Sequence, residues 1–439
     1  MKVRMYDVKF GECIMLYHEQ ENLLVDFGCD SGSEFCSDEA EYAVAKNGYV
    51  RRLERVAEDI VNESSGKDLS VLLSHFHDDH INGFLKTKLA DQVQVKNLYI
   101  PNVVEMNITH GKISALQMSI LHDIFEAVVL QNGSPKITLY SLLLKILDVN
   151  SKVQCVCFLE RGKDFEVSKT KYDVLWPCFK KLKYHSKTIT KVLKTAELLG
   201  LAEHIGGDGE QTGFDIVNEF AELIGNAYGR VSNSKYLSED KFRLIHELLP
   251  DLDSKYQELE DTISKFTDNK TLLSVNLQKE IKATIRMMDD KNKVSIVFQD
   301  RVEGAYHNVF MTGDALKSDL EWVIQQNEIG LPRHFSNRYL IVKAPHHGTP
   351  SHYTPLLPNC HFVLISNGKN RKGYGRIAYE YGGFLWSNRS ANMVCTNQNC
   401  ELLELDKKGK GHRCICCDDN KEEHRENNFL YIDYSIVIQ

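Results

Sequence analysis

The densest group of chemically useful side chains lies in SHFHDDHINGF, residues 74–84. Six consecutive positions, 75–80, hold three histidines and two aspartates. They follow the apolar run LSVLL, which is typical of a buried strand. Imidazole nitrogens and carboxylate oxygens are ligands that zinc, iron and manganese take in proteins. The segment therefore predicts either half of a metal site at a strand end or a polar loop that is rich in histidine.

The spacing of these side chains favours the metal site. In an extended loop alternate side chains share one side, so His75 and His77 can face one ion. Asp79 and His80 follow directly and can face a second ion. Isolated pairs of histidines are common at protein surfaces, whereas four potential ligands in the pattern His-x-His-x-Asp-His rarely arise by chance. We therefore expect a metal centre at this strand end.

Strands and helices around this segment should hold it in place. Strand patterns with tight turns fill much of the first hundred residues, among them VRMYDV, CIMLYH and NLLVDFG, with a helical pattern before LSVLL. Further strand patterns are KVQCVCFLE, KYDVLWP, KVSIVFQD, NVFMTGD, RYLIVKAP and HFVLISNG. Residues 180–288 instead repeat apolar side chains at i, i+3 and i+4. The pattern predicts an α/β fold with an inserted all-α segment.

Several motifs resemble the metallo-β-lactamase superfamily. HFHDDH resembles its signature loop, LLVDFG its strand with a buried aspartate (Asp26), FMTGDA its strand end with a bridging aspartate (Asp314), and KAPHHGT its late histidine motif. Within the superfamily the chain is most similar to the metallo-β-lactamase-like domain of ComEC-type DNA-uptake proteins. MYDVKFGECIML, HINGF, LYIP, VLWP, KVSIVF, TGD, PHHG and NGKNRKGYG carry this resemblance, over about residues 1–100, 150–178 and 291–405.

The resemblance implies an αββα sandwich of two mixed sheets with helices outside, and a centre for two divalent ions, zinc or manganese. The implied ligands are His75, His77, Asp79, His80, Asp314 and His346, and the implied catalytic residues are Asp79, Asp314 and His347. In an alternative assignment His347 is the ligand and His346 lies outside. Asp26 would contact one of the ligand side chains, rather than the metal, and so orient it; alternatively, it caps a turn.

The chain departs from the family pattern at two positions. Trp176 stands where the superfamily often has a third histidine, so we expect the two ions to bind with different affinities. Arg376 stands where ComEC-type domains usually have a histidine; it could bind a phosphate or lie at the surface. Lys343, and the basic loop 369–374 with Lys369 and an aromatic residue, are further candidates for substrate contact, with solvated surface groups as the alternative.

Twelve cysteines without a recognisable secretion signal predict reduced thiols or metal ligands rather than disulfide bonds. Some flank a glycine-bearing stretch late in the sequence and could bind a structural zinc ion, with His412 or His424 replacing one thiolate. The alternative is a set of partly buried thiols. The candidate zinc ligands are Cys395, Cys400, Cys414 and Cys417.

These patterns divide the chain into a metal-binding domain in two parts, residues 1–179 and 289–439, and a helical insertion, residues 180–288. The formal net charge of −8 argues against a strongly basic nucleic-acid protein, although not against a local basic groove. No apolar run approaches the roughly 18 residues of a membrane span. We expect a cytoplasmic protein that does not enter a membrane.

We expect a metal-dependent hydrolase of phosphodiesters, with nuclease activity on single-stranded nucleic acid as the leading form. One alternative is hydrolysis of a small cyclic nucleotide, ester or lactam. Another is a partner-binding module with a structural metal. The insertion is expected beside the mouth of the site, where it would limit substrate size or contact a protein partner or a second copy of the chain.

Overall fold

The chain folds into two compact units, one built on β-sheets and one made of helices. The sheet unit comprises Met1–Pro101, Lys152–Pro177 and Asn292–Gln439, and the helical unit comprises Asn102–Ser151 and Cys178–Lys291. The computed structural model describes residues 2–30, 48–108, 112–130, 135–199, 201, 212–267, 275–288, 290–301, 307–326, 338–370, 373–374, 377–378, 380–381, 392–396 and 429–433.

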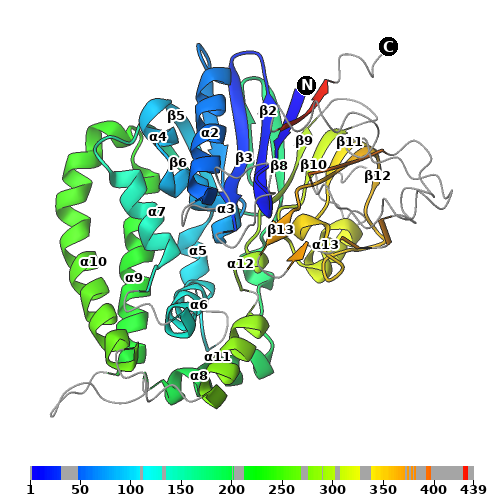
Figure 1. Ribbon diagram of the computed structural model, residues 1–439. Coiled ribbons are helices and arrows are strands. Elements are labelled where there is room, and N and C mark those ends of the chain that lie inside the picture. Colours follow the sequence, from blue (N-terminus) through cyan, green and yellow to red (C-terminus); the bar gives the residue numbers. More distant parts are fainter. Residues whose placement is uncertain are drawn as a thin grey trace. The chain divides into compact units, whose positions relative to one another are not determined.

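The described part of the sheet unit contains two mixed sheets of seven strands each, which confirms the α/β class (Figure 1). In the first sheet β16, β1, β2 and β3 pair antiparallel, and β3, β4, β5 and β6 pair in parallel. Its strands, in spatial order, are β16 (Phe429–Asp433), β1 (Lys2–Tyr6), β2 (Gly11–Tyr17), β3 (Glu21–Cys29), β4 (Asp68–Leu72), β5 (Val95–Pro101) and β6 (Val153–Leu159).

The second sheet has the same mixed character. β15, β12, β11 and β10 pair in parallel, and β10, β9, β8 and β7 pair antiparallel. Its strands, in spatial order, are β15 (Asn392–Cys395), β12 (Asn359–Ile365), β11 (Arg338–Lys343), β10 (His307–Met311), β9 (Val297–Arg301), β8 (Thr170–Trp176) and β7 (Asp164–Val167). A short pair, β13 (Lys369–Asn370) and β14 (Gly373–Tyr374), stands apart.

The two sheets share one hydrophobic core. Leu16 and Leu23 of the first sheet and Phe298 and Ile341 of the second belong to the same buried cluster. Burying each such side chain contributes roughly 1.5–3 kcal/mol, which makes this layer the main source of the unit's stability. Helices α2 (Gly48–Glu63) and α3 (Asp78–Lys86) contact β3, and α13 (Lys317–Gln325) contacts β8. The sheet unit also contains the short helix α4 (Leu89–Gln92), and the short helix α12 (Asp290–Lys293) has residues in both units.

The helical unit is organised around α9. Ile216, Phe220, Ile224 and Tyr228 recur every four residues on this helix and are fully buried, as its apolar periodicity predicts. A capping box at Thr212 fixes the start of the helix. The helices of the unit are α5 (Val103–Asn107), α6 (Ala115–Leu130), α7 (Thr138–Leu147), α8 (Ser186–Leu198), α9 (Gly213–Asn233), α10 (Leu237–Thr267) and α11 (Val275–Met288).

The helical unit is larger than the sequence pattern predicts. It takes in Asn102–Ser151 as well as Cys178–Lys291, whereas the pattern assigns residues 102–151 to the metal-binding domain. The reason is that α6, whose sequence alone does not reveal a partner, packs with α9 and α11. Among the described residues, none of the helices combines the length and the apolar character that crossing a bilayer requires.

Candidate metal centre

The predicted ligands come together at the carboxyl ends of parallel strands from both sheets. Because β3 and β4 are parallel, Asp26 near the end of β3 lies at the same edge as the loop that follows β4. Because β10 and β11 are parallel, Asp314 and the pair His346–His347 also share an edge. Ligand sites in sheets with parallel strands typically lie at this edge.

The backbone at this edge adopts conformations that are rare outside glycine. Asp26, His346 and His347 have φ angles of 55°, 47° and 55°. A left-handed backbone of this kind costs of order 1–3 kcal/mol at a non-glycine residue and is concentrated at functional sites. The β2–β3 register also shifts between Cys13 and Ile14, an irregularity that can re-aim a strand side chain such as that of Asp26.

Two glycines allow the strands to approach the ligand loop closely. A Cβ on Gly28 would lie 2.5 Å from the backbone of Asp79 and His80. Gly313 has a φ of +49°, and a Cβ there would lie 2.3 Å from Ser295 Oγ. Residues with larger side chains would therefore push the ligand-bearing segments apart.

The ligand motif itself is split between a loop and a helix. His77 precedes α3, and Asp78 and Asp79 occupy its first turn, where carboxylates complement the helix dipole. The His80 amide donates to the His77 carbonyl oxygen at 3.0 Å. The helix therefore holds Asp79 and His80 in place, while His75 and His77 remain on the extended segment before it.

One half of the centre consists of His75 and His77. The His75 Nε2 and His77 Nδ1 atoms lie 3.0 Å apart. The Ser74 hydroxyl donates to Asp26 Oδ2 at 2.7 Å and lies 3.1 Å from His75 Nδ1, so Nδ1–H is the donor there and Nε2 keeps its lone pair. Burial, reinforced by His80 and His77, holds the pKa of His75 well below its usual value. His75 is thus a neutral imidazole, the form that binds metals.

The other half consists of Asp79, His80 and His347. His80 Nδ1 donates to Asp26 Oδ2 at 2.9 Å, which leaves its Nε2 atom facing inward. His347 Nδ1 donates to the Ser366 carbonyl oxygen at 2.9 Å, and its Nε2 atom lies 3.1 Å from Asp79 Oδ2. Metal-binding histidines are held in this manner, with the nitrogen that does not bind the ion donating to a carboxylate or a carbonyl.

Asp314 joins the two halves. Its buried Oδ2 atom is 3.2 Å from His80 Nε2, 3.5 Å from His347 Nε2, 3.7 Å from His346 Nε2 and 4.0 Å from His75 Nε2. Asp314 Oδ2 and His80 Nε2 nevertheless have no hydrogen-bond partner. Buried polar atoms left unpaired cost about 1–3 kcal/mol each. A divalent cation among these atoms would satisfy them, so the residues present fit a metal.

The charges of the centre also fit a bound cation. Burial alone would lower the pKa of His80, but Asp314, Asp26 and Asp79 raise it well above its usual value. Burial likewise opposes protonation of His347, whose pKa is raised by Asp314 and Asp79. Carboxylates that draw protons onto neighbouring imidazoles also attract cations, and a bound metal releases those protons.

Lys343 lies behind the centre rather than at a surface for substrate. Its side chain is buried, and its Nζ atom lies 3.3 Å from Asp314 Oδ1 and 3.0 Å from Glu12 Oε2. It also donates to the Gly313 carbonyl oxygen at 2.8 Å. Burial opposes its charge, but Glu12 and Asp314 raise the pKa of Lys343. The candidate role in substrate contact therefore does not agree with its position, because no solvent reaches the ammonium group.

Other predicted residues contribute less. Trp176 is buried, and its indole donates to the Lys293 carbonyl oxygen at 2.8 Å. Cys395 ends β15 and is buried, and the backbone of Lys369 lies in β13. The Lys369 side chain and the predicted residues Arg376, Cys400, Cys414 and Cys417 lie outside the described residues.

Several supporting residues are not predicted from the sequence. Glu12 lies in the GEC segment of the opening motif, which is part of strand β2, but the motif does not reveal its ion pair with Lys343. Ser295 accepts the Asp314 amide at 2.8 Å and lies 3.4 Å from His75 Nδ1. Single serines carry no recognisable pattern, so only the fold identifies Ser295 and Ser366.

His346 differs from the other histidines. Its side chain is 27% exposed, and its Nδ1 atom lies 2.7 Å from Thr349 Oγ1. His347 is fully buried and contacts both Asp79 and Asp314. These positions favour the alternative assignment, in which His347 is a ligand and His346 lies outside.

Comparison with known proteins adds no further identification. No protein-family model matches the chain, and no curated protein matches it.

Proposed function

We propose that the chain is a metal-dependent hydrolase of phosphodiesters on a metallo-β-lactamase-type αββα sandwich. The observation that carries this proposal is the environment of Asp314 Oδ2, a buried carboxylate oxygen within 4.0 Å of four imidazole nitrogens and without a hydrogen-bond partner. Structural histidine clusters normally pair their nitrogens internally. The arrangement instead suits cations.

The donors divide into two sets that share Asp314. His75 and His77 would hold one ion, and Asp79, His80 and His347 the other. Two divalent ions held there would supply an activated water molecule and positive charge to neutralise a transferring phosphoryl group. The chain's own contribution is to fix the donors through Asp26, Ser295 and Ser366, and to bury most of the donor side chains away from bulk water.

The two sets should differ in affinity for metal. The second set has a carboxylate and two imidazoles of its own, whereas the first has two imidazoles and, at the position of the variable histidine, a tryptophan whose N–H is already bonded. We therefore propose that the Asp79–His80–His347 set fills first, and that the His75–His77 set fills at higher metal concentration.

The choice of phosphodiesters rests on the resemblance to ComEC-type domains together with the position of His346. A partly exposed histidine 3.7 Å from Asp314 Oδ2 can contact a substrate oxygen at the mouth. We extend the proposal to a cytoplasmic setting, in which thiols such as those of Cys13 and Cys29 stay reduced.

Turnover by the purified full-length protein tests the proposal. Bis(p-nitrophenyl) phosphate, cyclic nucleotides, a single-stranded oligonucleotide and a β-lactam would be assayed with zinc, with manganese and after chelation. We expect metal-dependent cleavage of a phosphodiester bond, abolished in a His75→Ala, His77→Ala double variant that binds less metal. Cleavage of the lactam alone would favour the other hydrolase class, and tight metal binding without turnover of any substrate would indicate a structural metal.

A further inference from the structure

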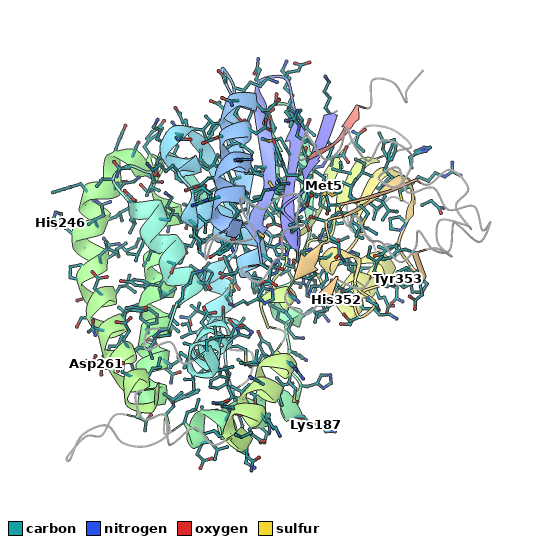
Figure 2. All side chains as sticks on the ribbon, viewed as in Figure 1. Met5, Lys187, His246, Asp261, His352 and Tyr353 are labelled. Atoms are coloured by element: carbon teal, nitrogen blue, oxygen red, sulfur yellow. The ribbon has the colours of Figure 1, made fainter. Side chains whose placement is uncertain are left out.

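The helical unit distributes its charge unevenly. Residues 179–198, which include α8, and helix α11 together carry nine Lys or Arg residues and two Glu residues, although the whole chain has a net charge of −8. Helix α10 instead carries eight Asp or Glu residues and four Lys or Arg residues. Figure 2 shows one residue of each kind, Lys187 on α8 and Asp261 on α10. The basic side chains are thus concentrated on α8, α11 and the segment before α8.

These basic side chains form stripes along two helices that pack together. Helices α8 and α11 are joined by a 2.8 Å hydrogen bond between the hydroxyls of Thr195 and Thr284, and by the ion pair Lys191–Glu280. Spacings of three, four and seven residues put side chains on the same side of a helix. The stripes are Lys187, Lys191 and Lys194 on α8, and Lys279, Lys282 and Arg286 on α11; all but the half-buried Lys191 are exposed.

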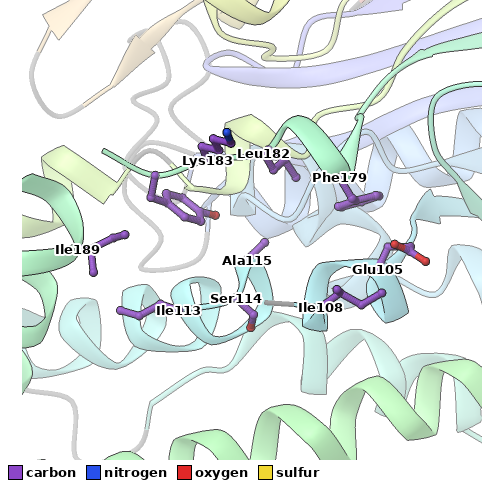
Figure 3. Close-up of a pocket in the computed structure, with 10 residues that line it drawn as sticks. Glu105, Ile108, Ile113, Ser114, Ala115, Phe179, Leu182, Lys183 and Ile189 are labelled. Carbon is purple, nitrogen blue, oxygen red and sulfur yellow. The ribbon is translucent and has the colours of Figure 1, made fainter. Parts of the chain in front are cut away.

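A small pocket adjoins the start of this basic region. It has a volume of about 140 Å³ and is lined by side chains from residues 179–189 and from the region of α5 and α6. Figure 3 shows Phe179, Leu182 and Ile189 around it, together with Lys183. Tyr184 also lines the pocket. Cavities of roughly this size accept a single aromatic ring in other proteins.

We propose that this Lys-rich surface, defined as residues 179–198 and helix α11, binds single-stranded nucleic acid. Phosphates would lie along the two stripes, and one base would enter the pocket beside Tyr184. A cationic track with an aromatic contact is the combination by which proteins bind single strands, and a duplex could not place a stacked base in a pocket. The inference extends the proposed hydrolase function by naming a polymeric substrate. That the bound nucleic acid is a substrate rests on the proposed function, whereas binding itself does not.

The strength of binding should reflect the charges. Counterion release makes the affinity for single strands fall with salt, with a slope of about −0.7 per phosphate contacted. Net negative charge elsewhere on the chain repels a polyanion, so the contacts should be confined to the Lys-rich surface. Neutralising four lysines should therefore reduce the steepness of log affinity against log salt concentration by up to about 3.

Fluorescence anisotropy with labelled single-stranded DNA and RNA tests this inference. The full-length protein would carry Asp314→Asn, so that binding is measured without hydrolysis. The test variant is Lys187→Gln, Lys194→Gln, Lys279→Gln, Lys282→Gln, and the matched control is Lys88→Gln, Lys169→Gln, Lys171→Gln, Lys317→Gln, four exposed lysines of the sheet unit. Tyr184→Leu tests the pocket, and circular dichroism checks that each variant is folded.

We expect the test variant to lose at least about 10-fold in affinity with a shallower salt dependence, and the control to bind like the parent. Tyr184→Leu should lose about 10-fold with an unchanged salt slope, because stacking is not a charge contact. Equal affinity of the test and control variants would overturn the inference, as would tighter binding of duplex, or binding only to vesicles that contain phosphatidylserine. Hydrolysis of bis(p-nitrophenyl) phosphate by the wild-type protein distinguishes failure of this surface from failure of the metal centre.

Discussion

Polar side chains are buried at both ends of β3, and the two ends differ in how these groups are satisfied. At its start, Glu21 accepts hydrogen bonds from Ser70 and from Lys96, and of the buried oxygens of Glu21 and Asn22 only the neutral amide oxygen of Asn22 has no partner. Nearby, His18 Nε2 lies 2.9 Å from the Tyr172 hydroxyl and Nδ1 lies 3.3 Å from Thr170 Oγ1. At the other end, Asp26 anchors His80, whose inward Nε2 atom has no hydrogen-bond partner, and the nearby carboxylate oxygen Asp314 Oδ2 has none either.

This difference separates a structural polar network from a candidate centre. Burial of charge alone does not identify function, because Glu21 is as buried as Asp26. What distinguishes the centre is that supporting bonds hold the Nδ1 atoms of His80 and His347 and leave their Nε2 atoms 3.2 and 3.5 Å from the carboxylate oxygen Asp314 Oδ2. The left-handed backbone at Asp26, His346 and His347 does not by itself separate the two ends, because Ser168, whose amide donates to Glu21, has a φ of 53° as well.

The largest difference in stability between the two ends of β3 should appear when the buried or partly exposed lysine that pairs with the carboxylates at each end is removed. Lys343→Met leaves Glu12 and Asp314 buried without their cation and should lower the free energy of unfolding by about 3–5 kcal/mol. Lys96→Met should cost about 1 kcal/mol or less, because the Lys96 side chain is 44% exposed and water can replace it beside Glu21. Urea denaturation measures both values.

Adding Glu12→Gln to Lys343→Met should restore part of the lost stability, because it removes one of the two buried carboxylate charges that have lost their counterion. If Lys343→Met and Lys96→Met cost the same, the distinction between the two ends of β3 would be wrong.

The next largest effect concerns turnover. Asp79→Asn keeps the shape of the side chain but removes a charge that faces His347. We expect hydrolysis to fall on the order of 10²-fold at saturating metal, about 2.7 kcal/mol in activation free energy. Glu21→Gln at the other end should leave turnover unchanged. Initial rates with bis(p-nitrophenyl) phosphate measure both variants, and a fully active Asp79→Asn protein would exclude Asp79 from the reaction.

Crowding at the centre is tested by two glycines with positive φ. Gly313→Ala places a methyl group against Ser295 and should cost about 1–3 kcal/mol of stability and weaken metal binding. Gly66 has a φ of +76° with open space around it, so Gly66→Ala should cost about 1 kcal/mol and leave metal binding intact. Thermal unfolding and cobalt titration compare them; equal cobalt affinity would show that close packing at Gly313 does not position Asp314.

The smallest effect is a pH dependence at the structural end. Burial lowers the pKa of His18 to about 4, below the value of about 6.5 in an unfolded chain. Between these values the unfolded state binds a proton that the folded state does not, so stability falls as pH falls through this window. Allowing for its partial exposure, we expect a loss of about 1–3 kcal/mol. Denaturation of wild type and His18→Gln at pH 7 and pH 4 isolates this contribution, which should vanish in the variant.

The sequence predicts the part of the centre that depends on local pattern. The spacing of His75, His77, Asp79 and His80 after a strand indicates a ligand loop, and the helical periodicity of residues 180–288 agrees with the helical character of α8 to α11. The pattern does not predict that α6 packs among those helices, because amphipathicity does not specify a partner. It also cannot rank His346 against His347, since only the backbone turn at these residues directs one ring inward.

The metal stoichiometry and metal-dependent turnover of a single preparation test the central claim most directly. Full-length protein would be stripped with chelator, titrated with manganese or zinc, and assayed for bound metal and for cleavage of bis(p-nitrophenyl) phosphate at each step. We predict two ions with different affinities, activity that follows the second ion, and loss of both activity and one ion in Asp314→Asn. Equal metal content and equal turnover of wild type and Asp314→Asn would contradict the account.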